Sequence, residues 1–141
     1  MARHGPSADC LNSVRQLERY VASVDSYSGH SFTVRVERDG VSAVLRLSGE
    51  FDVACEDSFT RAAEQALAGG TREVLVDLRD LAFIDSSGLR FLIALWMRSR
   101  REGFALSLLQ GTGHVRRILD IAGLQRFLPI ADPGSSKQSE T

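Results

Sequence analysis

The sequence predicts an α/β fold, in which a mixed sheet of four to five strands begins with an antiparallel hairpin. Two observations predict this class. An alternating apolar pattern appears on both sides of a turn near residue 40, as it does in a hairpin. After the hairpin, short apolar segments alternate with segments of helical periodicity, which is the pattern of strands joined by right-handed crossovers.

The hairpin is predicted for residues 32–47. Residues 32, 34 and 36 are apolar and alternate with polar residues, Asp39-Gly40 is a tight-turn signal, and alternation resumes over residues 41–47. A helix is predicted after Gly49, with Asp52 just ahead of it and a Gly-Gly pair at residues 69–70 ending it. The residues that share its apolar face are Cys55, Phe59, Ala62, Ala63, Ala66 and Leu67.

Residues 73–101 form the centre of the predicted fold. Residues 74–78, VLVDL, are short and rich in Val and Leu, which suits a strand covered on both faces, and we interpret their Asp77 as structural. Next comes a polar elbow, in which Asp85 and Ser86 stand where a helix needs a side-chain oxygen to cap its first amide groups. One hydroxyl is therefore displayed at the positive end of a helix dipole, where a phosphate is electrostatically favoured.

The helix after the elbow is apolar nearly all round. Arg90 is the one charge between Gly88 and Met97. Such a helix is usually buried on both sides, and we favour this interpretation. The alternative is that its outer edge forms a docking patch beside the elbow.

Further elements are predicted in the rest of the chain. A strand is predicted for residues 104–109, a helix from about Gly113 to Ala122, and an edge strand interrupted by proline within residues 127–130. At the amino terminus, Leu11, Val14, Leu17, Val21 and Val24 fall close to one helical face, which indicates either a short helix packed on the domain or on a partner, or a frayed extension. Residues 26–31 are interpreted as a linker.

Composition limits the possible functions. The chain has 141 residues and a formal net charge of -1, which fits one soluble globular domain and disfavours nucleic acid as a partner. Only Cys10 and Cys55 are present, without paired spacing or nearby histidines, so we expect neither a disulfide framework nor a zinc site, and no cofactor. No signal peptide or membrane-spanning run is visible, so we expect a cytoplasmic protein without a membrane partner.

Three motifs carry a family resemblance. Residues 81–89, LAFIDSSGL, resemble the signature of STAS domains, in particular the bacterial anti-sigma-factor antagonists. Residues 49–52, GEFD, resemble the family's Gly-Glu-Leu-Asp, and residues 115–124, VRRILDIAGL, resemble its closing helix and Gly-Leu corner. The resemblance implies a STAS-like single domain at residues 32–131, with a small sheet and helices mainly on one side of it. Composition predicts a polar extension at residues 1–31 and, from the Pro, Gly, Ser, Lys and Gln that dominate there, a disordered tail at residues 132–141.

The resemblance also implies a function. In anti-sigma-factor antagonists, the serine directly after the Asp is phosphorylated by the anti-sigma factor, which is itself an ATP-using serine kinase. By position this serine is Ser86, and Ser87 is the alternative hydroxyl. We expect the unphosphorylated chain to bind the anti-sigma factor and release a sigma factor, until phosphorylation ends binding and a phosphatase restores it. The expected partner-binding residues are Asp52, Asp85, Ser86, Ser87, Gly88, Leu89 and Arg90.

The elbow also admits other interpretations. The nucleophile elbow of hydrolases needs glycines on both sides of its serine and a base, whereas Ile84-Asp85 precedes Ser86, so an enzyme is not expected. His114 is interpreted as a solvated helix start rather than a general base, and the elbow taken alone fits a simple helix cap. Two alternatives stay open: a non-phosphorylated STAS scaffold subunit of a signalling or lipid-transport assembly, and a weak nucleotide-binding or hydrolytic protein.

Two positions depart from the family pattern. The family often has Thr where Cys55 stands and a small residue where Arg90 stands. Helix capping and the fit of a partner beside the elbow are therefore expected to differ here. A bulky arginine beside the phosphorylated serine would also be able to pair with the phosphate.

Overall fold

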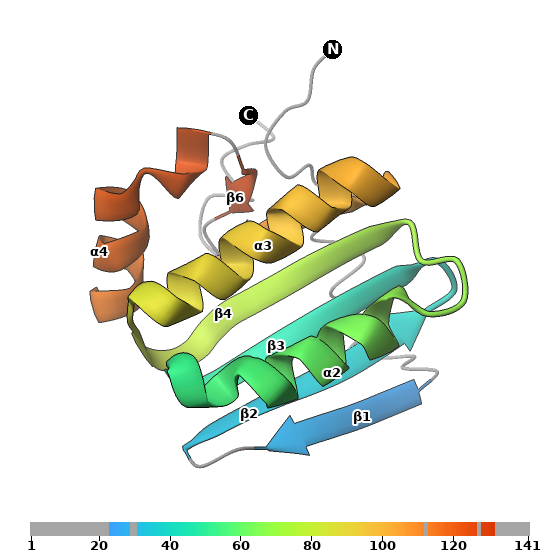
Figure 1. Ribbon diagram of the computed structural model, residues 1–141, viewed down its shortest axis with the longest axis horizontal. Helices are drawn as coiled ribbons and strands as arrows, with labels where there is room; N and C mark the ends of the chain where they lie inside the picture. Colours follow the sequence, from blue (N-terminus) through green and yellow to red (C-terminus); the bar gives the residue numbers. More distant parts are fainter. Residues whose placement is uncertain (1–22, 29–30, 112, 127, 132–141) are drawn as a thin grey trace, which may run out of the picture.

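The computed structural model describes residues 23–28, 31–111, 113–126 and 128–131 of the chain. In this part, six strands form one sheet that carries helices on one face, and the strands follow one another across the sheet in chain order (Figure 1). The strands are β1 (Ser23–Ser28), β2 (Phe32–Asp39), β3 (Ser42–Phe51), β4 (Glu73–Ile84), β5 (Ala105–Leu109) and β6 (Ile130–Ala131). The helices are η1 (Val53–Cys55), α2 (Glu56–Leu67), α3 (Ser86–Glu102), α4 (Gly113–Ala122) and η2 (Leu124–Arg126), of which η1 and η2 are single 3-10 turns.

The sheet is mixed, as predicted. β1, β2 and β3 pair antiparallel, and β2 with β3 is the predicted hairpin. β3, β4, β5 and β6 pair parallel, which requires the crossovers that α2, α3 and α4 provide. The predicted α/β class is therefore confirmed, but the described sheet has six strands where four to five were predicted, because β1 precedes the hairpin.

The interpretation of residues 26–31 as a linker was wrong for residues 26–28. These residues belong to β1, which pairs with β2 along its whole length, from Ser23 opposite Arg38 to Ser28 opposite Thr33. The sequence SVDSYS is rich in Ser and Asp, which are weak strand formers, so its pattern gave no strand signal. The backbone hydrogen bonds of the exposed edge of β2 override this low propensity.

The main core lies between the sheet and its helices. Alternate residues of each strand point to this side, as the period of two requires, and the buried residues of the helices join them in one cluster. Four phenylalanine rings contact one another within it. Phe32 and Phe51 stack with ring centroids 5.1 Å apart, and Phe51 makes tilted contacts with Phe59 at 5.1 Å and with Phe91 at 5.7 Å. These rings join β2, β3, α2 and α3 at the end of the sheet where β4 runs into α3.

The interpretation that α3 is buried on both sides was wrong. Its buried residues are Gly88, Leu92, Leu95 and Ser99, which recur every three to four residues and mark one face. On the other side Ala94 and Met97 are exposed, and Met97 is 52% exposed. Apolar composition did not reveal this, because a small or flexible apolar side chain is tolerated on a surface. α3 is therefore buried along one face and exposes Ala94 and Met97 on the other.

β4 is longer than the part of β3 that it accompanies. The pairing shifts register twice, between Arg46 and Ser48 and again between Gly49 and Glu50, and each shift places an extra residue in β4. The two strands nevertheless end together, because Phe51 stands opposite Ile84. The loops that follow both strands, with Asp52 after β3 and Asp85 after β4, are therefore brought side by side.

Candidate functional site

The centre of the candidate site is the elbow between β4 and α3. Asp85 keeps an extended backbone and is the N-cap of α3, with one side-chain oxygen, Oδ1, accepting hydrogen bonds from the amides of Ser87 (2.9 Å) and Gly88 (3.1 Å). The predicted cap is thus made by Asp85, not by a serine. Because Asp85 already caps the helix, the hydroxyl groups of the two serines are not needed for it.

The two serines differ in their accessibility. Ser86 is the first residue of α3 and is exposed, whereas Ser87 is half-buried. Within the described part of the chain, nothing hydrogen-bonds to the Ser86 hydroxyl. This hydroxyl therefore projects into solvent at the amino-terminal end of a helix dipole, where it can be reached by another protein.

Gly88 allows α3 to start close to the end of β3. A Cβ atom at this position would lie 2.6 Å from the carbonyl oxygen of Phe51 and 2.8 Å from Cγ1 of Ile84. Gly88 is buried, Leu89 is half-buried against the core, and Arg90 is exposed. Of these three predicted partner-binding residues, only Arg90 is placed for unobstructed contact with a partner, and Gly88 has a packing role.

Replacing Gly88 with alanine is expected to lower the free energy of unfolding by about 1–3 kcal/mol, because the added methyl group meets backbone and a packed ring. This loss runs against the intrinsic preference of helices for alanine over glycine, about 1 kcal/mol. Urea denaturation measures the change, and Arg90→Ala on the same turn is the control, with less than about 0.5 kcal/mol expected. A Gly88→Ala protein as stable as the unchanged one would contradict the close approach.

The loop around Asp52, which follows β3, forms the other side of the site. Asp52 is half-buried and caps η1 by accepting a hydrogen bond from the amide of Ala54 at 3.0 Å. The thiol of Cys55 accepts from the Asp52 amide (3.3 Å) and donates to the carbonyl of Glu50 (3.1 Å). The thiol thus completes a capping box at a position where the family pattern often has Thr. The expected difference in capping therefore concerns the capping atom, which is a sulfur instead of a hydroxyl oxygen, and not the geometry of the cap.

The environment of Cys55 is both buried and negatively charged. Burial raises the pKa of Cys55 to about 11, and the charges of Asp52 and Asp85 act in the same direction. The effect of both carboxylates on one sulfur agrees with the strand register, which brings the two loops together. Asp52 and Asp85 therefore border the same small volume beneath the elbow.

This pKa predicts a loss of stability at alkaline pH. Between pH 9 and 11 the Cys55 thiol ionises in the unfolded chain but stays protonated in the folded one, so the unfolded state releases a proton and gains stability. The free energy of unfolding should fall more steeply over this range for the unchanged protein than for Cys55→Thr, which keeps a cap but has no thiol here. Urea denaturation at several pH values measures the two slopes, and equal slopes would refute the assignment.

Two exposed apolar side chains flank the elbow. Val53, next to Asp52, is 63% exposed, and Phe83, opposite Glu50 near the end of β4, is 40% exposed. The ring of His114 stacks on Phe83, with centroids 5.0 Å apart, and its Nε2 lies 3.1 Å from the carbonyl oxygen of Ile84. Because a carbonyl only accepts, Nε2 carries the proton and donates. His114 is thus tied to the end of β4 beside the elbow.

Sequence reasoning did not assign Val53, Phe83 or His114 to the site. Val53 follows a motif residue and Phe83 lies inside the LAFIDSSGL motif, but the pattern did not show that they are exposed. His114 is close only because α4 packs against β4. Exposure and tertiary proximity of this kind depend on how distant segments meet.

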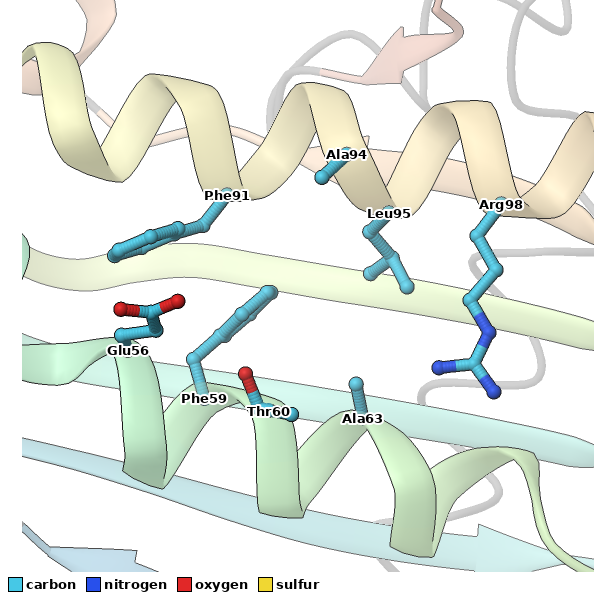
Figure 2. A pocket seen from close by; sticks show the side chains of 8 residues that line it. All are labelled: Glu56, Phe59, Thr60, Ala63, Phe91, Ala94, Leu95 and Arg98. Carbon is cyan, nitrogen blue, oxygen red and sulfur yellow. The ribbon is translucent and has the colours of Figure 1, made fainter.

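A groove lies between α2 and α3 (Figure 2). It measures about 190 Å³, below the roughly 300–1,000 Å³ of sites that enclose a small molecule, so it suits protruding side chains of a partner. Phe59 and Phe91 face each other near the end marked by Glu56. At the other end, Arg98 spans the helices through bonds of 2.7 and 3.2 Å to Glu64, which lower the pKa of that carboxyl. The lining residues are Glu56, Phe59, Thr60, Ala63, Phe91, Ala94, Leu95 and Arg98.

The described residues contain no cluster of three or more His, Cys, Asp or Glu side chains placed to hold a metal ion. Their helices include none with the length and apolar character needed to cross a membrane.

Comparison with known proteins finds relatives that match most of the folded part of the chain. The sequence profile of the family described as "Mlab, STAS domain" matches residues 34–129. The chain is 30% identical over 90 residues to an anti-sigma F factor antagonist of Paenibacillus polymyxa, covering 63% of this chain and 77% of that protein. It is also 30% identical over 101 residues to a STAS-domain containing protein of Pseudomonas aeruginosa, covering 72% of this chain and 99% of that protein.

Solved structures share the fold. An anti-sigma factor antagonist from Mycobacterium paratuberculosis superposes with a TM-score of 0.65 at 21% identity, covering 81% of this chain and 97% of that one. The unphosphorylated form of the anti-sigma factor antagonist SpoIIAA gives a TM-score of 0.61 at 21% identity, covering 76% and 93%. At these identities the likeness concerns the fold alone.

Proposed function

Because the chain belongs to the STAS-domain family, we propose that it is an anti-sigma-factor antagonist that binds an anti-sigma factor and thereby frees a sigma factor. A relative at 30% identity carries the name of anti-sigma F factor antagonist, which supports this assignment. The proposal makes the chain a cytoplasmic regulatory binding protein without catalytic activity of its own. Its partner is an anti-sigma factor with serine kinase activity, and a phosphatase reverses the modification.

One observation carries the regulatory part of the proposal: the exposed hydroxyl of Ser86. It stands at the first position of α3, where a kinase can reach it and where the cap is already made by Asp85. The neighbouring Ser87 is half-buried. This difference favours Ser86 over Ser87 as the phosphorylated residue.

The surface around Ser86 fits a protein partner. Val53 and Phe83 supply exposed apolar area on either side, and the groove between α2 and α3 extends it away from the elbow. Asp52 and Arg90 add polar contacts at its edge. An apolar centre with charged residues around it is the usual anatomy of a protein interface.

Phosphorylation of Ser86 would weaken the binding of this partner. A phosphoserine brings nearly two negative charges to a surface that already holds Asp85 and Asp52. A partner complementary to the neutral hydroxyl would then meet unpaired negative charge, which costs several kcal/mol. Arg90, one turn further along α3, forms no ion pair with another described residue and is the cation best placed to accompany the phosphate.

The test is phosphorylation by the partner kinase. The protein is incubated with each candidate anti-sigma kinase and ATP and then digested with trypsin, which cuts after Arg79 and Arg90. The peptide of residues 80–90 contains Ser86 and Ser87 and no other hydroxyl, so its fragment ions assign the phosphate to one of them. Absence of phosphate from this peptide with every kinase that binds the protein would refute the switch.

The alternatives left by the sequence predict different results. A scaffold subunit that is not phosphorylated would co-purify with a stable assembly and would leave the peptide of residues 80–90 unmodified. A nucleotide-binding or hydrolytic protein would bind ATP or GTP by itself. Isothermal titration of the isolated protein with both nucleotides separates this last possibility from the other two.

A further inference from the structure

The groove between α2 and α3 has an apolar interior with an open middle. Three of its lining residues, Phe59, Ala63 and Leu95, are only 4%, 5% and 5% exposed. Phe59 stacks with Phe91 across the groove, with ring centroids 6.3 Å apart and the ring planes inclined by 21°. Next to this pair, Ala63 of α2 and Ala94 of α3 line the groove (Figure 2). Because an alanine side chain ends at Cβ, these two positions leave the middle of the groove unfilled.

The two ends of the groove differ in charge. At one end, Arg98 donates hydrogen bonds of 2.7 and 3.2 Å to the two carboxylate oxygens of Glu64, so its charge is neutralised. At the other end, Glu56 is exposed and forms neither a hydrogen bond nor an ion pair with any residue that the structure describes. Its neighbour Asp57, by contrast, pairs with Arg61 at 3.3 Å. The groove therefore combines an apolar interior with one unpaired negative charge at its edge.

These two features select the chemistry of an occupant. The apolar interior favours an aliphatic or aromatic side chain, which gains free energy when it leaves water. The unpaired carboxylate of Glu56 favours a lysine or an arginine, because complementary charges at the edge of an interface speed association and exclude wrong partners. An acidic segment is disfavoured, since Glu56 would repel it and Glu64 already neutralises Arg98.

The end of the groove at Glu56 continues from the loop around Asp52. Glu56 directly follows Cys55, whose thiol accepts a hydrogen bond from the Asp52 amide at 3.3 Å. The ring of Phe91 lies 5.7 Å from the ring of Phe51, the residue before Asp52. A protein that contacts the loop around Asp52 can therefore also place a neighbouring segment in the groove.

We propose that the groove binds a segment of the anti-sigma factor in which an apolar side chain inserts between Ala63 and Ala94 and a lysine or arginine pairs with Glu56. This inference rests on the proposed function and adds to it the chemistry of the partner's contact. The two surfaces would have separate roles. The groove supplies binding energy in a constant way, whereas the elbow at Ser86 supplies the contact that phosphorylation changes.

Filling the groove tests the apolar contact. Ala94→Leu places a larger aliphatic side chain in the open middle, and Ala122→Leu makes the same change at an exposed alanine of α4 as the matched control. Surface plasmon resonance with an anti-sigma factor that binds the unchanged protein measures both affinities. We expect Ala94→Leu to weaken binding about tenfold and Ala122→Leu to leave it unchanged. Circular dichroism checks that both variants are folded.

The kinetics of phosphorylation give a second measurement on the same variants. Ala94→Leu leaves the exposed hydroxyl of Ser86 in place, so it removes a contact that is made equally before and during phosphate transfer. KM for the protein as kinase substrate should therefore rise about tenfold while kcat stays unchanged. A fall in kcat with KM unchanged would show that the substitution disturbs the elbow, and would contradict a separate docking contact.

Removing the unpaired charge tests the polar contact. Glu56→Gln is expected to weaken binding about fivefold at low salt, with a smaller effect at high salt, because the lost attraction is screened there. Asp57→Asn is the matched control, since it removes a charge that Arg61 already neutralises, and its affinity should stay unchanged. Equal affinities of the Glu56→Gln variant and the unchanged protein at low salt would refute the pairing with a cation.

The outcomes separate this inference from the proposed function. If no anti-sigma factor binds the unchanged protein, the proposed function is wrong and the inference falls with it. If one binds, and Ala94→Leu and Ala122→Leu bind it equally well, the proposed function stands and the groove inference alone is wrong. A concentration-dependent dimer that Ala94→Leu abolishes, seen by analytical ultracentrifugation, would assign the groove to a second copy of the chain instead.

Discussion

Ser86→Asp is expected to lower the affinity for the anti-sigma factor by about 100-fold, while Ser86→Ala keeps nearly full affinity. The reason is electrostatic: Ser86 is exposed beside Asp85, and one added charge at a desolvated contact costs about 3 kcal/mol, which corresponds to this factor. Surface plasmon resonance with the immobilised partner measures both dissociation constants. Phosphorylated wild-type protein, with a larger charge, should bind no better than Ser86→Asp.

The matched control for this experiment is Ser86→Asn. Asparagine has the size of aspartate and lacks its charge, so it separates electrostatic repulsion from steric exclusion. Binding close to that of Ser86→Ala supports repulsion by charge. Affinities that fall equally in the Asn and Asp variants would show that the elbow accepts no larger side chain, and the proposed switch would lose its basis.

Arg46→Met is expected to lower the free energy of unfolding by about 3–5 kcal/mol, a large share of the 5–15 kcal/mol typical of a domain. Arg46 is the cation between two buried carboxylates, Glu37 and Asp77, and its own side chain is only 15% exposed. Methionine fills a similar volume but leaves both carboxylates without this partner. Urea denaturation followed by circular dichroism measures the change.

Arg35→Met is the control for this second prediction. Arg35 also contacts Glu37, at 3.5 Å, but its side chain is 50% exposed, so the loss should stay below about 1 kcal/mol. A further check removes the charges that Arg46 balances: in a Glu37→Gln, Asp77→Asn background, Arg46→Met should cost clearly less. Equal losses for Arg46→Met and Arg35→Met would contradict the central position of Arg46.

The fold class was predictable because its signals are local. The turn at Asp39-Gly40, the Val- and Leu-rich start of β4 and the helical periodicity of α2 each depend on neighbouring residues. β1 was missed, since a Ser-rich strand forms only because β2 offers an unpaired edge. The one-sided burial of α3 was also missed, because sequence does not tell which apolar residues of a helix meet a second layer.

The site was predictable to a similar extent. The elbow motif placed Asp85 and Ser86 at a strand-to-helix junction, and the structure has them there. It did not show that Asp85 is the cap, that Ser87 is the less accessible hydroxyl, or that His114 lies against Phe83. These features arise where β4, α3 and α4 meet, and no single segment encodes them.

A single side-chain oxygen of Asp85 accepts the hydrogen bonds from the amides of both Ser87 and Gly88. A phosphate arriving on the preceding side chain would find those donors occupied and would remain outside the helix, surrounded by water. The domain would then keep one backbone conformation in both chemical states, with no moving part of its own. The two states would then differ only in surface charge, and the change would show only in the affinity for the binding partner.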